Sequence, residues 1–152
     1  MTHARSGRSV MVLLVTGDGR LLMHLRDDRE GVLHPGCWAG FGGAVAPGES
    51  DRDALNREML EETGVELGQA RFIAELVDEV DEGGGGDIVA LYWGEGVEPG
   101  DIDLQEGAGT GVFSIEQLEG MKVSPFVRRL LADHGATVVA PWSQSRANPD
   151  LR

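Results

Sequence analysis

One acidic segment constrains the fold of this chain more than any other feature. From Gly42 to Glu66 the sequence reads GGAVAPGESDRDALNREMLEETGVE, with a Pro-Gly turn before a helical stretch. Ser50 is a residue type that caps helix N-termini, and Gly64 suits the left-handed backbone that ends helices. The segment therefore predicts a loop–helix–loop unit whose helix ends at about Thr63.

The helix of this unit carries a carboxylate face. At about 100° per residue, Glu58, Glu61 and Glu62 fall within an arc of roughly 100°. Leu55 and Met59 lie beside this arc and form an apolar face that can pack on a sheet. Close carboxylates disfavour each other's ionised form, and a hard divalent cation such as Mg²⁺ or Mn²⁺ would resolve the repulsion. The alternative is a solvated face, the usual fate of charge runs.

The acidic composition of the chain limits the partners that it can bind without a cation. The chain has 26 Asp and Glu against 13 Lys and Arg, a formal net charge of −13. It therefore lacks the basic footprint of nucleic-acid-binding proteins. No apolar run approaches the length of a membrane-spanning helix. We expect no nucleic-acid partner and no membrane partner, and any bound anion needs a cation to attract it.

Cysteine content and length set the compartment and the domain count. Cys37 is the single cysteine, which excludes an intrachain disulfide and a cysteine-based zinc site. The N-terminus lacks the pattern of a signal peptide, so we expect a cytoplasmic protein. The length of 152 residues fits one domain. We predict a single domain over residues 1–137 and a polar, flexible tail over 138–152.

Strands and helices alternate irregularly around the acidic segment. A short apolar, glycine-rich stretch at 37–45 leads into the turn, and short helices are predicted at 114–120 and 124–134. The predicted strands are 9–16, 21–27, 70–80, 87–97 and 112–114. This mixed order, with hairpin connections, predicts an α+β or α/β/α layered domain rather than a doubly wound parallel sheet.

The spacing inside the acidic segment matches a known motif. Gly43 is followed after five residues by Glu49, seven further residues precede Arg57-Glu58, and the match continues to Val65. The segment resembles the Nudix box, G-x5-E-x7-R-E-U-x-E-E-x-G-U, at every defined position, where U is apolar. The predicted strands on either side fit the rest of a Nudix domain.

The resemblance implies a fold and an activity. Nudix proteins have an α/β fold, an α/β/α sandwich with a mixed β-sheet, and the box forms a loop–helix–loop that binds Mg²⁺ or Mn²⁺. Most members hydrolyse a nucleoside diphosphate linked to another moiety, with metal-activated water. The implied function is a Mg²⁺-dependent pyrophosphohydrolase acting on a nucleoside tri- or diphosphate, or on a nucleoside diphosphate-X.

The resemblance also implies roles for individual residues. Arg57 would orient carboxylates by pairing with Glu49, and Glu61 is the expected general base. Gly43 would let a phosphate approach the backbone, and Gly64 would end the helix. The expected metal ligands are Glu58, Glu61, Glu62 and the carbonyl of Gly42.

A later acidic loop offers a rival to this assignment. The stretch LQEGAGTGVFS resembles a loop of some Nudix nucleoside triphosphatases, in which a glutamate before glycine reaches back to the metal. That glutamate would be Glu106, with Asp101 and Asp103 as alternatives. Glu106 is therefore a candidate metal ligand and a rival to Glu61 as the base, unless the loop is simply an acidic surface.

Substrate contacts are expected near the box. Arg26 and Arg29 could meet a phosphate or a base. Aromatic side chains could stack on a nucleobase, although strand aromatics are more often core; the candidates are Trp38, Phe41, Tyr92 and Trp93. The histidines show no ligand spacing, and His24 and His34 are expected to be structural.

Other functions stay open on these residues alone. The chain could bind a nucleotide as a sensor without cleaving it, or hydrolyse a nucleotide sugar. An isomerase-like enzyme is a further alternative, because the related isopentenyl diphosphate isomerases use a cysteine in the region of Cys37. The sequence does not name the nucleotide or the attacked phosphorus. A homodimer is the expected assembly if the protein is an oligomer.

Overall fold

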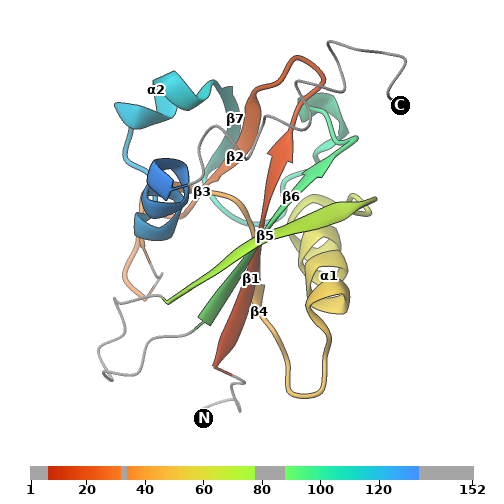
Figure 1. Ribbon diagram of the computed structural model, residues 1–152. Helices are drawn as coiled ribbons and strands as arrows, with labels where there is room; N and C mark the ends of the chain where they lie inside the picture. Colours follow the sequence, from red (N-terminus) through yellow and green to blue (C-terminus); the bar gives the residue numbers. More distant parts are fainter. Residues whose placement is uncertain (1–6, 32–33, 78–87, 134–152) are drawn as a thin grey trace.

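A mixed β-sheet forms the centre of the computed structural model, which describes residues 7–31, 34–77 and 88–133 (Figure 1). The tail predicted at 138–152 and the whole loop predicted at 81–86 lie outside these ranges. The strands are β1 (Arg8–Val15), β2 (Leu21–Leu25), β3 (Trp38–Ala39), β4 (Phe41–Ala44), β5 (Ala70–Val77), β6 (Ile88–Glu95) and β7 (Gly109–Phe113). The helical elements are α1 (Asp51–Thr63), η1 (Pro99–Asp101), α2 (Ile115–Glu119) and a helix over 125–133.

β1 is the middle strand of the sheet, whose order is β3-β2-β1-β6-β5. β6 runs parallel to β1, from the Arg8–Ile88 pair to the Val15–Glu95 pair. The other edge of β1 pairs antiparallel with β4 at its start and with β2 at its end. β7 pairs antiparallel with β2, and β5 with β6. This mixed topology agrees with the predicted layered domain.

Helices cover both faces of the sheet (Figure 1). Successive strand residues point to opposite faces, so β1 supplies two cores. Its odd-numbered residues 11–15 pack in one cluster with Leu118 of α2 and Leu130 of the last helix. Its even-numbered residues 10–14 pack in the other with Leu55 of α1. The α/β/α sandwich prediction is confirmed. In the described part of the chain, no helix is long and apolar enough to cross a membrane.

Helix α1 begins and ends where its sequence signals place it. The Ser50 hydroxyl caps the helix by accepting a hydrogen bond from the Asp53 amide at 3.1 Å. Gly64 follows with φ of 71°, the left-handed conformation that glycine adopts without strain. Leu55 and Met59 are fully buried against the sheet. The predicted loop–helix–loop is therefore confirmed.

Strand boundaries depart from the prediction beside the acidic loop. The strand predicted at 112–114 begins earlier, at Gly109, and Asp101 lies at the end of the short helix η1. Glycine is poor at forming strands by itself, so the sequence conceals this start. Pairing with β2, in which Gly109 faces Leu25, brings the glycine-rich segment into the sheet.

Candidate active site

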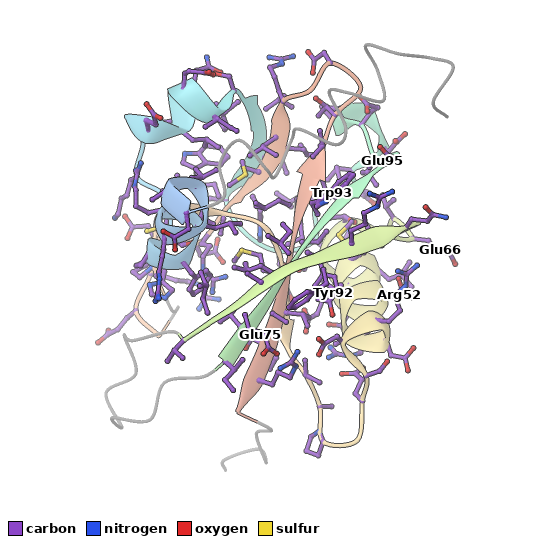
Figure 2. All side chains as sticks on the ribbon, in the orientation of Figure 1. Arg52, Glu66, Glu75, Tyr92, Trp93 and Glu95 are labelled. Atoms are coloured by element: carbon purple, nitrogen blue, oxygen red, sulfur yellow. The ribbon has the colours of Figure 1, made fainter. Side chains whose placement is uncertain are left out.

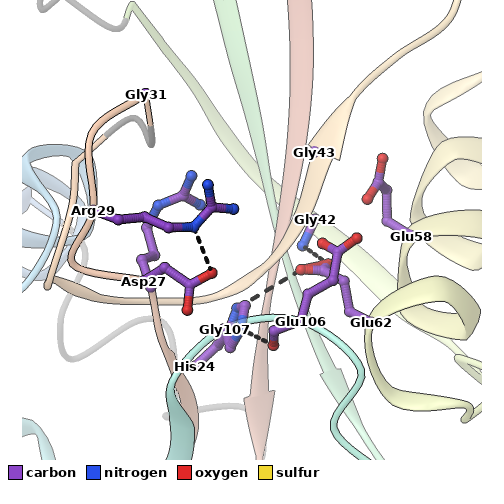
Figure 3. A pocket seen from close by; sticks show the side chains of 11 residues that line it. His24, Asp27, Arg29, Gly31, Gly42, Gly43, Glu58, Glu62, Glu106 and Gly107 are labelled. Carbon is purple, nitrogen blue, oxygen red and sulfur yellow. Dashed lines mark hydrogen bonds and ion pairs between the residues drawn. The ribbon is translucent and has the colours of Figure 1, made fainter.

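A cavity of about 350 Å³ opens between α1, β2, β4 and the loop before β7 (Figure 3). Glu58 and Glu62 reach it from α1, and Glu106 reaches it from the loop. Figure 3 shows Arg29 across the cavity from Glu58. The lining residues are His24, Arg26, Asp27, Arg29, Gly31, Gly42, Gly43, Glu58, Glu62, Glu106 and Gly107.

Glu62 is the most enclosed of these carboxylates, with 4% of its surface exposed. Its Oε1 accepts a hydrogen bond from the Gly42 amide at 2.9 Å. Burial raises the pKa of Glu62 to about 8, and the nearby charges of Glu58 and Glu106 act in the same direction. Its charge is therefore poorly compensated by the protein around it.

Glu58 lies one turn earlier and packs against the backbone of β4. Burial raises the pKa of its carboxyl, although a 2.9 Å hydrogen bond from Arg57 opposes this. A Cβ added at Gly43 would lie 2.6 Å from the Glu58 carboxylate. Glycine at position 43 therefore makes room for the acid.

Arg57 holds the outer side of this segment. Its Nε and Nη2 each donate to one oxygen of Glu49 at 2.9 Å, and Nη2 also donates to the Ala44 carbonyl at 2.9 Å. The Arg57 guanidinium lowers the pKa of Glu49 to about 2. A bidentate pair of this kind fixes both side chains. Because Arg57 also donates a hydrogen bond to Glu58, one side chain holds both the turn before α1 and an acid of the cavity.

Glu61 has a different setting from its neighbour Glu62. Its side chain is 52% exposed and contacts Arg57 at 3.4 Å. It does not belong to the lining of the cavity. Of the acids predicted for the site, the structure gathers Glu58, Glu62 and Glu106, and it leaves Glu61 at the solvent side of the helix.

The loop that carries Glu106 is attached to the end of α1. The Asp103 amide donates to the Thr63 carbonyl at 2.9 Å, and the Gln105 amide donates to the Glu62 carbonyl at 2.7 Å. The last carbonyls of a helix lack partners within the helix, so the loop satisfies them. The same bonds bring Glu106 to the cavity, whereas Asp101 and Asp103 are not part of its lining.

His24, which we expected to be structural, lies within this site. Its Nε2 is 2.8 Å from the Glu106 carbonyl, and its Nδ1 is 3.7 Å from Glu62 Oε2, too far for a hydrogen bond. Burial lowers the pKa of His24, which favours a neutral ring. A histidine within the apolar strand LLMHL is the only signal that the sequence offers. Asp27 and Gly107 also line the cavity without having been predicted.

None of the predicted aromatic side chains lines the cavity. Phe41 is fully buried, so it has no free face for a nucleobase, and that prediction is corrected. Phe41 pairs with Val12 of β1, and both side chains lie on the face of the sheet that α1 covers. Trp38 packs edge-on against Phe113, with ring centroids 4.8 Å apart. Tyr92 and Trp93, adjacent residues of β6 that are labelled in Figure 2, do not line the cavity either.

The donor set of the cavity fits a hard cation. Carboxylate oxygens are the ligands that Mg²⁺ and Mn²⁺ prefer. Burial, and after it the neighbouring carboxylates, raises the pKa values of Glu58 and Glu62, and a cation would stabilise their charged forms. Among residues 7–31, 34–77 and 88–133, no three acidic, histidine or cysteine side chains form a ready-made ligand cluster. The residues that would hold an ion are Glu58, Glu62, Glu106 and the Gly42 carbonyl.

Comparison with known proteins identifies the family. The family model for the NUDIX domain matches residues 5–133. This chain belongs to the Nudix family. The match includes the whole segment from Gly43 to Val65 as well as the sheet around it. The cavity therefore lies at the Nudix box of a Nudix domain.

Individual relatives are similar over different lengths. The nucleoside triphosphatase NudI of Escherichia fergusonii is 45% identical over 60 residues, which are 40% of this chain and 42% of that protein. The chain thus matches less than half the length of that relative. The MutT protein from Methanosarcina mazei Go1 is 24% identical, with a TM-score of 0.72 over 83% of this chain and 90% of that one. The E. coli ORF135 protein is 26% identical, with a TM-score of 0.58 over 92% and 91%.

Proposed function

We propose that this protein is a Mg²⁺- or Mn²⁺-dependent Nudix pyrophosphohydrolase that cleaves a phosphoanhydride bond of a nucleoside tri- or diphosphate. The observation that carries the proposal is the meeting of Glu58, Glu62 and Glu106 in one cavity that Arg26 and Arg29 also line. Such a substrate needs acids that hold a cation and arginines that contact its phosphate chain.

The acids of the cavity and the residues that hold them have separate roles in this proposal. A bound cation would neutralise phosphate charge and lower the pKa of water. Glu58, Glu62 and Glu106 would hold the cation, and Arg57 would keep Glu58 in position through the 2.9 Å bond. Gly43 would let the Glu58 carboxylate lie against the backbone of β4. The chain supplies little covalent chemistry, since positioning and charge dominate phosphoryl transfer.

The general base is a choice between two carboxylates. The box spacing assigns the role to Glu61, which would have to turn inward from its exposed position. Glu106 already lines the cavity and is the alternative that the geometry favours. In either case a carboxylate oxygen takes the proton of the attacking water. We expect substitution of the base by glutamine to remove the acidic limb of the pH–rate profile, which identifies the residue.

The substrate class follows from the similarity to a named relative. The matched protein of Escherichia fergusonii is called a nucleoside triphosphatase, and the shared region is 45% identical. This supports a nucleotide with a simple phosphate chain as the substrate. Nucleotide sugars remain the alternative within the same reaction class.

Hydrolysis of a substrate panel tests this function. The panel holds nucleoside tri- and diphosphates, ADP-ribose, nucleotide sugars and dinucleoside polyphosphates, each with Mg²⁺, Mn²⁺ or EDTA. We expect metal-dependent release of a nucleotide from one class, and reaction in ¹⁸O-labelled water then identifies the attacked phosphorus. Tight nucleotide binding without any product would instead support a sensor.

A further inference from the structure

His24 is a cavity residue to which the proposed chemistry gives no role. It lies in β2 and is 4% exposed. One side of its ring stacks on Phe41, with centroids 5.0 Å apart and planes 10° from parallel. On the side of the loop, a Cβ added at Gly107 would lie 2.0 Å from His24 Nε2. The ring is therefore fixed between a core side chain and a glycine that leaves room for it.

The contacts of this ring define its hydrogen-bonding state. The Glu106 carbonyl, 2.8 Å from Nε2, can only accept a hydrogen bond, so Nε2 carries a proton and donates it. Nδ1 faces Glu62 Oε2 at 3.7 Å and has no hydrogen-bond partner among the described residues. A single ring thus lies between two residues that we propose to hold the cation (Figure 3).

The hydrogen bond from His24 to the Glu106 carbonyl lies between two backbone hydrogen bonds that hold the same loop. Backbone bonds fasten the loop on either side, from the Gln105 amide to the Glu62 carbonyl at 2.7 Å and from the Ala108 amide to the Leu25 carbonyl at 2.9 Å. The His24 bond lies between them, at the residue whose carboxylate enters the cavity. The separation between the loop acid and the helix acid therefore depends on this side chain.

We infer that His24 is a positioning residue, whose Nε2–H bond to the Glu106 carbonyl sets the spacing of the Glu106 and Glu62 carboxylates for a divalent cation. This inference rests on the proposed metal-dependent function and adds a residue to it. Partners that orient metal-binding residues typically change metal affinity by about 10- to 100-fold when they are removed.

The test uses two replacements of the ring and a control. His24→Phe keeps a ring that can stack on Phe41 but removes the donor. His24→Gln offers an amide N–H near the position of Nε2 and should restore the bond. Tyr92→Phe is the control, because it deletes a side-chain donor, the hydroxyl that binds Asp51 at 2.8 Å, away from the cavity.

The measurements are Mn²⁺ affinity without nucleotide, by electron paramagnetic resonance, and kcat and KM against Mn²⁺ concentration. We expect His24→Phe to weaken Mn²⁺ binding by about 10-fold or more and to raise the Mn²⁺ requirement of hydrolysis. His24→Gln should recover most of the affinity, and Tyr92→Phe should match the wild type. Thermal melts in EDTA confirm that each variant is folded.

Two further results complete the test. If His24→Phe does not fold, Gly107→Ala is the second variant. Its methyl group would lie against His24 Nε2 and the Leu25 carbonyl at a residue with φ of 93°, so it should move the loop away from the ring and weaken Mn²⁺ binding at least as much. Suppose that the wild type binds Mn²⁺ and hydrolyses nucleotides, and that His24→Phe (or Gly107→Ala in its place) does both equally well. The inference about His24 would then be wrong, while the proposed function would stand. A wild type that binds no Mn²⁺ and hydrolyses nothing would overturn the proposed function as well.

Discussion

Two glutamates of the same loop–helix segment meet opposite environments. On the outer side, Glu49 receives hydrogen bonds on both oxygens from Arg57 at 2.9 Å, and its pKa falls to about 2. In the cavity, Glu62 is 4% exposed, accepts one bond from the Gly42 amide, and has its pKa raised to about 8. The protein neutralises one charge itself and leaves the other largely uncompensated.

This contrast separates an acid whose charge the protein pairs from an acid whose charge it leaves unpaired. Burying a carboxylate without a paired cation is unfavourable for folding, so stability alone does not explain Glu62 in the cavity. Glu58 and Glu106, which line the same cavity, add repulsion to the cost of burial. The arrangement is accounted for if a cation from solution completes it, and perturbed acids in a cavity are characteristic of functional sites.

The largest expected effect comes from Glu62→Gln. Removing one preorganised charge-stabilising group typically lowers kcat by about 100- to 1,000-fold, and we expect at least that loss in metal-dependent hydrolysis. In EDTA at about pH 9, above the Glu62 pKa of about 8, the same variant should melt at a higher temperature than the wild type, because a buried charge that Glu58 and Glu106 repel is gone. Activity assays and thermal melts together check these opposite signs.

Glu66→Gln is the matched control for this prediction, since Glu66 is exposed beyond the end of α1. It should change neither activity nor melting temperature. A Glu62→Gln variant that kept full activity would show that the cavity is not the metal site.

Gly43→Ala should come next in size. The added methyl group would meet the flexible end of Glu58 at 2.6 Å, so the acid moves while the backbone stays. A displacement of about 1 Å in an active site can lower the rate by about 100-fold. Steady-state kinetics should therefore show a loss of kcat with a nearly unchanged melting temperature.

Gly42→Ala sharpens the comparison between neighbouring glycines. Its Cβ would lie 2.0 Å from the Val10 carbonyl, which is rigid backbone. Overpacking of this kind destabilises folded proteins by about 1–3 kcal/mol or more, and chemical denaturation should report it. If the Gly42→Ala and Gly43→Ala variants were equally stable, the distinction between a rigid backbone neighbour at Gly42 and a flexible side-chain neighbour at Gly43 would be wrong.

Arg57→Lys should have a smaller effect, on the outer side of the segment. Lysine keeps the charge but cannot reproduce the fork that binds Glu49 and Glu58 together. Lost hydrogen bonds to charged groups suggest a decrease of about 1–2 kcal/mol in unfolding free energy. Because Glu58 also loses its anchor, kcat should fall by about 10-fold. Retention of wild-type stability and rate would show that the bidentate geometry is unimportant.

The sequence predicted the parts of the molecule that depend on local signals. Ser50 and Gly64 marked the limits of α1, and the spacing from Gly43 to Val65 was enough to indicate the family. The apolar run at 9–16 predicted β1, and the mixed order of strands and helices predicted the layered architecture. Each of these signals lies within one element or one turn of the chain.

The sequence could not predict contacts that depend on pairing between distant strands. His24 meets the Glu106 loop because β2 pairs with β7, in a register that places His24 opposite Thr110. Phe41 is buried because β4 pairs with β1 and faces α1. No local pattern encodes these registers, so the stacking role predicted for Phe41 was wrong and the place of His24 in the cavity was not predicted.

The most direct test of the central claim is the pH dependence of stability with and without metal. The pKa of Glu62 rises from an ordinary value of 4.5 to about 8 in the fold. Its favourable contribution is therefore complete below about pH 4.5 and is lost as pH increases through about 8. The lowered pKa of Glu49 acts oppositely, with a contribution that is lost as pH falls from 4.5 toward 2.

Thermal melts between about pH 5 and about pH 9 would follow the alkaline change. In EDTA we expect the wild type to lose stability as pH rises, by up to a few kcal/mol, whereas Glu62→Gln, which keeps only the raised pKa of Glu58, should lose less. Saturating Mg²⁺ or Mn²⁺ should remove the loss in the wild type and leave the variant unchanged. Parallel profiles for both proteins, unaffected by metal, would contradict a cation site at Glu62.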